Sequence, residues 1–377
     1  MHPSSLMPYY PTYSLLDEFV TKNNYKVLNL YIDLKNCLQT VYMEHAVVNM
    51  IESTRRSQFV DTSMFSALLA FLNFHKTYSI KRNIHINFFI FFETGRSTYH
   101  LEIQKTYKQK RLLDDLYGLD KESKELFRDI GQKNLQLIEK AFNRVPYVKV
   151  IRLHQLEADF VPHYLIGRKL TTQPNTCHVI YSNDHDMHQT LIYDDVFIFR
   201  KVKQMKYIVS RNNAMTMELK RDTEIDISYH PLYLAIAGDE GDDVYGIGSI
   251  GPATFIKIFP QLNEMIGGDM NTLYDNVLHK RDIFDMSKYT NPNKYIDLIL
   301  QAEKESNKIS NNLKLVSFEL ISRMFESPIN TEIQARRNAV KEIIESKLIA
   351  NKNSLVESLT RLNVFFGDEF DTLYRGV

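Results

Sequence analysis

The chain has 377 residues, of which 44% are hydrophobic and 24% charged, as in ordinary soluble globular proteins. This length allows a sizeable core and two domains, and 22 Phe and 22 Tyr residues argue against disorder. The 46 basic and 46 acidic residues cancel, which at first argues against a nucleic-acid partner, because phosphate groups bind Lys and Arg. If eight carboxylates are held around metal ions, however, 46 basic residues face 38 acidic ones, and the remaining surface carries about +8.

Cysteine content and hydropathy bear on the compartment. Cys37 and Cys177 are far apart in the sequence, which argues against a disulfide framework or a zinc site and favours a reducing compartment. Met1 is not followed by a signal-peptide pattern. The most apolar run, residues 86–92, is far shorter than the roughly 20 residues that span a bilayer. We therefore expect a soluble cytoplasmic protein without membrane contact.

In chain order, residues 1–25 contain the early prolines and are predicted to be an irregular N-terminal extension. From Lys26 onwards, short apolar runs alternate with helical patterns such as residues 56–75. The runs that predict strands are residues 26–32, 84–92, 148–151 and 178–181. This alternation predicts a mostly parallel sheet with helices on both faces. Residues 196–210 alternate like a hairpin, and residues 297–324 and 331–348 are predicted to be amphipathic helices.

Acidic residues follow the predicted strands. They are Asp33, Glu93, Glu157 with Asp159, and Asp184 with Asp186; a fifth segment, AGDEGDD at 237–243, adds Asp239 and Asp242. Because the carboxyl ends of parallel strands meet at one edge of a sheet, we expect these side chains to converge there. So many like charges would destabilise the fold without cations between them. The pattern therefore predicts a cation site.

The type of ligand narrows the choice of cation. Oxygen ligands without a Cys or His pattern suit Mg²⁺, Mn²⁺ or Ca²⁺. A calcium loop that begins at Asp184 would place Gln189 and Asp195 where an EF-hand requires Gly and Glu, which excludes an EF-hand. Carboxylates that hold two divalent ions about 4 Å apart are suited to phosphodiester hydrolysis.

The order and spacing of these segments resemble the 5′-nuclease (flap endonuclease) family over residues 26–262, most closely its compact bacteriophage members. Those members include exonuclease, flap-endonuclease and ribonuclease H types, and the 5′-nuclease domain of bacterial DNA polymerase I is a relative. The matching motifs are Asp33 with Asn36; Glu93 followed by Lys108 and Arg111; Glu157-Ala158-Asp159; Asp184 with Asp186; and Gly238, Asp239 and Asp242, which run into GIGSIG at 246–251.

The resemblance implies a fold and a division of the chain. The fold is α/β, with a central, mostly parallel sheet flanked by helices (PIN or 5′-nuclease type). The resemblance also implies a helical arch at 112–145, a helix–three-turn–helix near 235–262 and a nuclease core at 26–262. Residues 263–377 are then a helical C-terminal region, which either docks replication proteins or covers the core.

The resemblance also implies roles for individual residues. Two Mg²⁺ ions, for which Mn²⁺ can substitute, would be held by Asp33, Glu93, Glu157, Asp159, Asp184, Asp186, Asp239 and Asp242. Lys108 and Arg111 would contact the scissile phosphate, with Asp184 and Asp186 as catalytic ligands. Nucleic acid would contact Tyr107, Lys108, Arg111, Gly246, Gly248, Ser249 and Gly251. Taken alone, Tyr107 can equally be a packing residue, and the glycines can form a plain tight turn.

The function implied is a metal-dependent, structure-specific 5′-nuclease, monomeric and cytoplasmic (in the host bacterium if a phage encodes it). It would cut DNA with a 5′ flap, nick or RNA primer during replication or repair. Phe160 stands where the family has a further acid, so the sequence also allows a weakened second metal site, or a catalytically inert nucleic-acid-binding relative. An RNA-directed nuclease is disfavoured, because GIGSIG would have no use there.

Overall fold

The structure is a computed structural model that describes most of the chain. The described residues are 24–36, 62–109, 138–202, 205–248, 250–327 and 331–345, with short pieces at 16–17, 20–21 and 135–136. Several predictions lie outside these residues: Arg111, Ser249, most of the N-terminal extension and most of the predicted arch. Among the described residues, no helix is long and apolar enough to cross a membrane.

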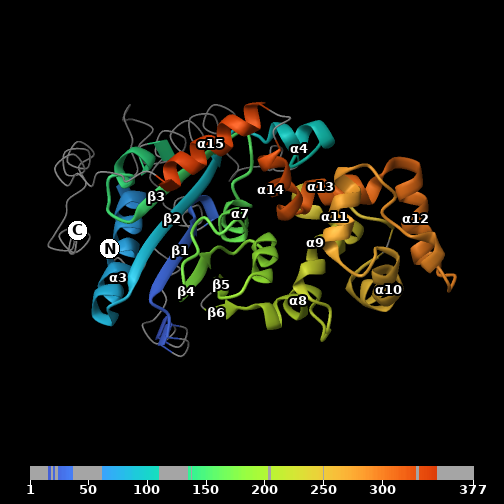
Figure 1. Ribbon diagram of the computed structural model, residues 1–377, viewed down its shortest axis with the longest axis horizontal. Helices are drawn as coiled ribbons and strands as arrows, with labels where there is room; N and C mark the ends of the chain where they lie inside the picture. The colour runs from blue at the N-terminus through green and yellow to red at the C-terminus, as the bar shows by residue number, and fades with distance from the viewer. Residues whose placement is uncertain are drawn as a thin grey trace, which may run out of the picture.

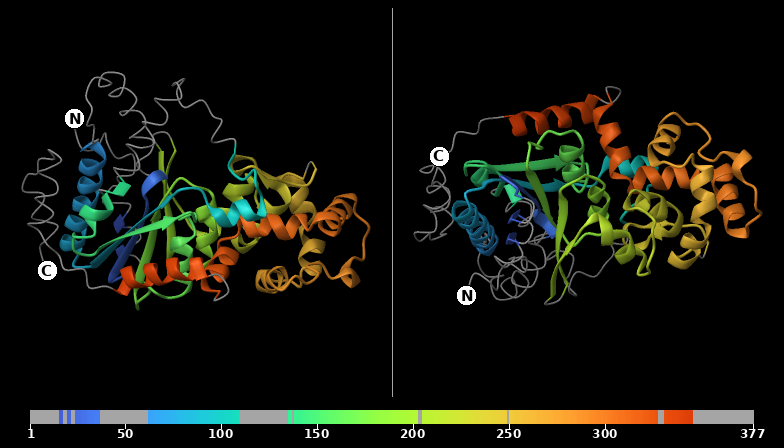
Figure 2. Two further views of the ribbon diagram at one scale, coloured as in Figure 1. Left: turned by 90° about the horizontal axis from the view of Figure 1, so that it is seen from above. Right: turned by 60° about the horizontal axis from the view of Figure 1, so that its bottom comes forward.

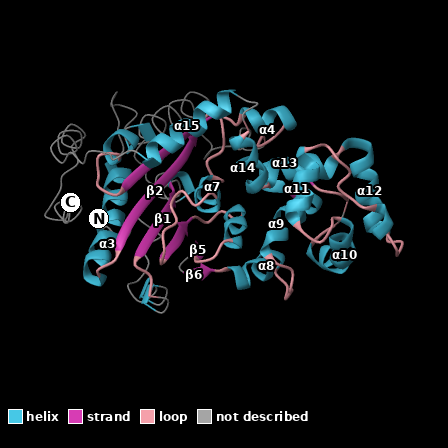
Figure 3. Ribbon diagram, viewed as in Figure 1, coloured by secondary structure: helices cyan, strands magenta, loops and turns pink. Residues whose placement is uncertain are grey.

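A six-stranded sheet, with strand order β3-β2-β1-β4-β5-β6, lies in the left half of the molecule as drawn in Figures 1 and 3. The strands are β1 (Val27–Asp33), β2 (His85–Thr94), β3 (Val148–His154), β4 (Thr176–Tyr181), β5 (Val196–Val202) and β6 (Met205–Val209). Neighbouring strands from β3 to β5 pair in parallel, whereas β5 and β6 form an antiparallel hairpin. The predicted strands, the hairpin and the mostly parallel sheet are confirmed.

Alternating side chains of the central strands build a separate hydrophobic cluster on each face of the sheet. Leu28, Leu30 and Ile32 of β1 join one cluster with α3 (Thr62–Arg82), whereas Tyr31 joins the other with α7 (Val161–Gly167). Every residue of β1 is buried, as expected for a strand covered on both faces. Helix α3 continues past residue 75, where the sequence pattern ended, to Arg82.

The second half of the chain is mainly helical and lies beside the sheet (Figures 1 and 2). Its elements up to residue 245 are η2 (Asp186–Ile192), α8 (Arg211–Leu219), η3 (Ile227–Tyr229), α9 (His230–Ala237), β7 (Gly238–Asp239), η4 (Glu240–Asp242) and β8 (Val244–Tyr245). They are followed by α10 (Pro252–Met265), α11 (Met270–Leu278), η5 (Met286–Lys288), α12 (Lys294–Ser306), α13 (Lys308–Val316), α14 (Phe318–Glu326) and α15 (Thr331–Glu345). A short helix, α4 (Thr98–Ile103), contacts α13.

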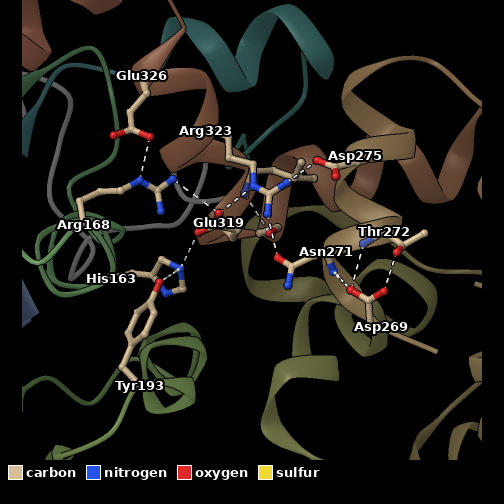
Figure 4. Close-up of polar contacts among 12 residues, drawn as sticks. His163, Arg168, Tyr193, Asp269, Asn271, Thr272, Asp275, Glu319, Arg323 and Glu326 are labelled. Atoms are coloured by element: carbon tan, nitrogen blue, oxygen red, sulfur yellow. Dashed lines mark hydrogen bonds and ion pairs between the residues drawn. The ribbon is translucent and has the colours of Figure 1, made fainter. Parts of the chain in front are cut away.

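The helices beyond residue 262 pack directly on the elements around the sheet, including α7 and β3. Glu319 of α14 accepts hydrogen bonds from Arg168, which follows α7, and from Arg323 (Figure 4). The Nε2 atom of His163 lies 3.3 Å from Glu319 and 3.0 Å from the hydroxyl of Tyr193. Helix α15 lies against β3 at the end of the sheet. The division at residue 262 stays a prediction, and a single hydrophobic cluster spans it.

Candidate metal centre

The acidic residues at the sheet edge are held by local hydrogen bonds. Asp33 is the last residue of β1, and its carboxylate accepts from the amide of Asn36 (3.0 Å) and the hydroxyl of Ser182 (3.0 Å). Ser182 directly follows β4, which pairs with β1, so the two strand ends are linked at the same edge. Ser182 is not among the predicted site residues, although the sequence places it directly after the predicted strand at 178–181.

The turn at 183–186 presents two acids from the end of β4. The amide of Asn183 donates to Oδ1 of Asn36 (2.8 Å), which ties the turn to the residue that follows β1. The amide of Asp184 donates to the Ser182 hydroxyl (3.1 Å), and the amide of Asp186 donates to Oδ1 of Asp184 (3.0 Å). These hydrogen bonds fix the turn, in which the charge of Asp184 acts on Asp33 and the Asp186 carboxylate lies close to those of Asp239 and Asp242.

The segment 237–251 approaches the same edge through a tight backbone arrangement. Asp239 caps η4 by accepting from the amide of Gly241 (2.9 Å). Gly238 has a φ of +88°, and a Cβ on Gly246 would lie 2.1 Å from the carbonyl oxygen of Ala237. No side chain fits at Gly246, because the backbones of β7 and β8 pass too close. This turn places Asp239 and Asp242 beside Asp186.

The acids form two groups. The first, which we call the Asp33 group, consists of Asp33, Glu93, Asp159 and Asp184. Burial, reinforced by the charges of Asp184 and Glu93, raises the pKa of Asp33 to about 7. Burial and the charges of Asp33, Glu93 and Asp184 raise the pKa of Asp159 well above its usual range. The side chain of Glu93 forms an ion pair with Lys35 (2.5 Å).

The second group, the Asp242 group, consists of Glu157, Asp186, Asp239 and Asp242. One carboxylate oxygen from each of Asp186, Asp239 and Asp242 lies within 4.8 Å of the others. Burial and the charges of Asp184, Asp242 and Asp239 raise the pKa of Asp186 well above its usual range. Asp184 thus acts on the carboxylates of both groups.

A lysine reaches into the Asp242 group. Lys108 Nζ lies 2.7 Å from Oε1 of Glu157 and 3.1 Å from Oδ2 of Asp242. Burial would raise the pKa of Glu157, but the charge of Lys108 and hydrogen bonds from Lys108 and Tyr107 lower it to about 2. The hydroxyl of Tyr107 also donates to Asp242 (2.9 Å). Lys108 is thus placed next to the acids, and its contact with the scissile phosphate stays a prediction.

The chemistry of this donor set fits a hard divalent cation. The ligand atoms are carboxylate oxygens, which Mg²⁺ and Mn²⁺ prefer over nitrogen or sulfur. Carboxylic acids whose pKa values are raised by one another's charge gain most from a cation placed between them. Asp186, Asp239 and Asp242 are close enough to share one cation, and the ligand roles of the other acids stay a prediction.

The predicted nucleic-acid residues fall in different environments. Tyr107 is 4% exposed and stacks on His100 with ring centroids 4.6 Å apart, so its burial favours the packing role. Gly246 is explained by the close backbone approach within the turn. Gly248 has a φ of +53°, and a Cβ on Gly251, the N-cap of α10, would meet nothing within 4 Å. Gly251 therefore has open space in front of it, whereas Gly246 does not.

Phe160 belongs to the hydrophobic core. It is 1% exposed, and its ring packs against Phe325 of α14 with centroids 5.2 Å apart. The side chain therefore helps to attach the C-terminal helices. The Phe160→Asp substitution would bury a charge, so it would test stability before it tested metal binding.

The comparisons with known proteins rest on structure. No protein-family model matches the sequence, and neither does any curated protein. A structure of the T5 D15 protein co-crystallised with metal ions superposes with a TM-score of 0.56 and 17% identity. The match covers 84% of this chain and 100% of that one. The T5 5′-exonuclease with bound zinc gives 0.54 and 18%, covering 84% and 100%. The bacteriophage T5 flap endonuclease in a complex with DNA and metal ions also gives 0.54 and 18%, covering 85% and 100%.

This likeness covers 84% to 85% of the chain. In this chain the sheet, the acids at its edge and the helices α9 and α10 with the turn between them follow one another as parts of a single fold. The chain therefore has the fold of the bacteriophage 5′-nucleases, as its motifs predicted.

Proposed function

We propose that this protein is a divalent-metal-dependent, structure-specific 5′-nuclease that hydrolyses phosphodiesters near the 5′ ends of DNA or RNA–DNA. The observation that carries the proposal is the convergence of acids from separate segments on one sheet edge, where Asp186, Asp239 and Asp242 approach within 4.8 Å. The fold supports it, because similar structures are described as a 5′-exonuclease and as a flap endonuclease bound to DNA.

The metal centre would hold two Mg²⁺ ions, with Mn²⁺ as a substitute. Bound ions of this kind activate a water molecule and stabilise the leaving oxygen. The chain itself supplies the frame: Ser182 and Asn36 hold Asp33 in place, and the turn at 183–186 presents Asp184 to the Asp33 group and Asp186 to the Asp242 group. The ligands are therefore fixed before substrate arrives, which reduces the cost of reorganisation during the reaction.

Lys108 would act on the phosphate that is cut. Its ammonium group lies beside Glu157 and Asp242, which places it at the acidic site. A cation there offsets the charge that develops on the phosphate oxygens in the transition state. Arg111 would add to this charge, by the family resemblance.

DNA would be gripped at the turn that follows the acids. Helix α10 begins at Pro252 behind Gly251, where a Cβ would meet open space, so a phosphate could approach the backbone at this point. The distance between this turn and the acids would then set where the strand is cut. Primer removal during replication, or repair, is the process that such an activity would serve.

A labelled 5′-flap duplex tests the proposal. Incubation with Mg²⁺ or Mn²⁺ should release short 5′-phosphorylated products, and EDTA or Asp184→Asn should abolish them. A matched substrate without a flap or free 5′ end should be cut more slowly. If the protein binds the flap but cuts it in neither metal, the inert nucleic-acid-binding relative is the correct alternative, and the nuclease proposal fails.

A further inference from the structure

A buried network of charged and polar side chains lies behind the turn at 183–186. Arg200 of β5 is 3% exposed, and its Nη2 donates to the carbonyl oxygen of Asn183 (2.5 Å). Its Nη1 lies 3.1 Å from Nε2 of His188. The Nδ1 atom of His188 lies 3.1 Å from Oε2 of Glu218 on α8. We call Arg200, His188 and Glu218 the Arg200 network.

The chemistry of these groups decides the direction of the hydrogen bonds. A guanidinium group can only donate, so Nε2 of His188 must accept from Arg200. Neutral His188 then carries its proton on Nδ1 and donates it to Glu218. The network thus joins the buried charge of Arg200 to the carboxylate of Glu218 through a single tautomer of His188, with its proton on Nδ1.

The network holds the turn at two points. Arg200 fixes the carbonyl of Asn183, and Glu218 contacts Nδ1 of His185, which lies between the two acids of the turn, at 3.1 Å. The acids on either side of His185 repel other carboxylates of the site, so the turn needs anchors outside the acidic cluster.

The same side chains could in principle bind a metal ion. Ligand atoms of His185, His188 and Glu218 lie within 4.8 Å of one another. However, the guanidinium of Arg200 lies 3.1 Å from His188 and 3.4 Å from Nδ1 of His185. A permanent positive charge there opposes a cation, and the guanidinium already engages the Nε2 lone pair of His188. The observations therefore favour a hydrogen-bonded support over a second metal site.

We propose that Arg200 is a positioning residue for the turn at 183–186, and that it thereby sets the affinity of the acidic cluster for divalent cations. The inference rests on the proposed function, because it assumes that Asp184 and Asp186 bind those cations. Residues that hold metal ligands in place by hydrogen bonds act in this way, and their loss costs about 10- to 100-fold in metal affinity or activity.

Mn²⁺ binding to the full chain, measured by titration calorimetry without DNA, is the direct test. Arg200→Met should weaken Mn²⁺ binding by about 10-fold or more. Arg200→Lys should also weaken it, because a single ammonium cannot reproduce the two-pronged contact. The matched control is Arg168→Met, which removes another partly buried arginine paired with carboxylates, Glu319 and Glu326. Binding by this control should stay within about twofold of the wild type.

Kinetics separate positioning from a general loss of structure. The Mn²⁺ concentration for half-maximal cleavage should rise in Arg200→Met by the same factor as the dissociation constant. The KM for flap DNA at saturating Mn²⁺ should not change, because Arg200 is buried. If Arg200→Met does not fold, Arg200→Lys and Glu218→Gln are measured instead. Glu218→Gln disturbs the far end of the network and should lower Mn²⁺ affinity by a smaller factor.

Each contrary outcome has a distinct meaning. Equal Mn²⁺ affinity in the wild type, Arg200→Met and Glu218→Gln would overturn the positioning role and leave the nuclease proposal intact. A wild type that binds no Mn²⁺ and cuts no flap would overturn the proposed function, and this inference with it. An additional equivalent of Zn²⁺ bound by the wild type and lost in His188→Gln would show that the network is a metal site instead.

Discussion

The two acidic groups consist of the same kinds of residue but differ in the cation that accompanies them. In the Asp33 group, the pKa of Asp33 is raised to about 7 by burial and by its acidic neighbours. In the Asp242 group, the pKa of Glu157 is lowered to about 2, because the charge and hydrogen bond of Lys108 outweigh burial. The cation of the Asp33 group, Lys35, is partly exposed and forms an ion pair with Glu93 at the margin of this group.

This difference shows that an acidic pattern at strand ends does not by itself define the charge of a site. Lys108 stabilises Glu157 in its charged form without metal, but Asp186 of the same group keeps a raised pKa. The pKa values of Asp33, Asp159 and Asp186 are raised by burial and by neighbouring carboxylates, so a divalent cation stabilises these acids most. The four predictions below test this contrast.

Asp184→Asn should have the largest effect, because the charge of Asp184 acts on both groups. We expect flap cleavage in Mg²⁺ to fall by at least about 1000-fold, with little change in stability. Cleavage of a labelled flap under single-turnover conditions measures this. The exposed Asp222→Asn is the control. A loss of less than tenfold would show that Asp184 does not bridge the two groups.

The metal-free protein should lose stability as the pH rises. The ordinary pKa of an Asp side chain is 3.8, whereas the pKa of Asp33 in the folded protein is about 7. The folded state therefore binds the Asp33 proton more tightly than the unfolded state does. That stabilisation is present below about pH 4 and disappears as the pH rises to 7, with about 4 kcal/mol as an upper bound. Urea unfolding in EDTA between pH 4.5 and 8 measures it.

The matched variant for this pH effect is Asp33→Asn. It should be more stable than the wild type at pH 8 in EDTA, because it removes a buried charge, and the advantage should vanish near pH 4. Addition of Mn²⁺ should reverse the order at pH 8. A wild type that gains stability with pH in EDTA while Asp33→Asn does not would contradict the raised pKa.

Lys108→Met should destabilise the protein by up to about 3 kcal/mol at pH 7, because it leaves Glu157 and Asp242 without their cation. The lowered pKa of Glu157 fixes the sign of the pH dependence. Its stabilisation is complete above about pH 4.5 and is lost as the pH falls toward 2. The difference between wild type and variant in unfolding free energy should therefore shrink in acid, and a constant gap would argue against this pairing.

Glu93→Gln should have the smallest effect. The Glu93–Lys35 pair has side chains 26% and 36% exposed, so solvent screens it, and its loss should change stability by less than about 1 kcal/mol. Mn²⁺ affinity measured by calorimetry should fall less than in Asp184→Asn. An equally large fall would place Glu93 at the centre of the Asp33 group and not at its margin.

The sequence by itself was enough for the strands, for the mostly parallel sheet and for the acids at its edge. A buried parallel strand needs a continuous apolar run, and parallel strand ends meet at one edge, so Asp33 and Asp184 could be placed together without coordinates. The order of the motifs also predicted the helix–turn–helix that begins with α9 and ends with α10.

The tertiary structure alone decided which side chains enter the site and which support it. Tyr107 is buried against His100, Phe160 packs on a helix more than 150 residues away, and Arg200 reaches the turn through a neighbouring strand. The physical reason is that burial and pairing depend on contacts between segments distant in sequence. A local pattern specifies the backbone on which a residue sits, but the partner that its side chain meets is set by how the whole chain packs.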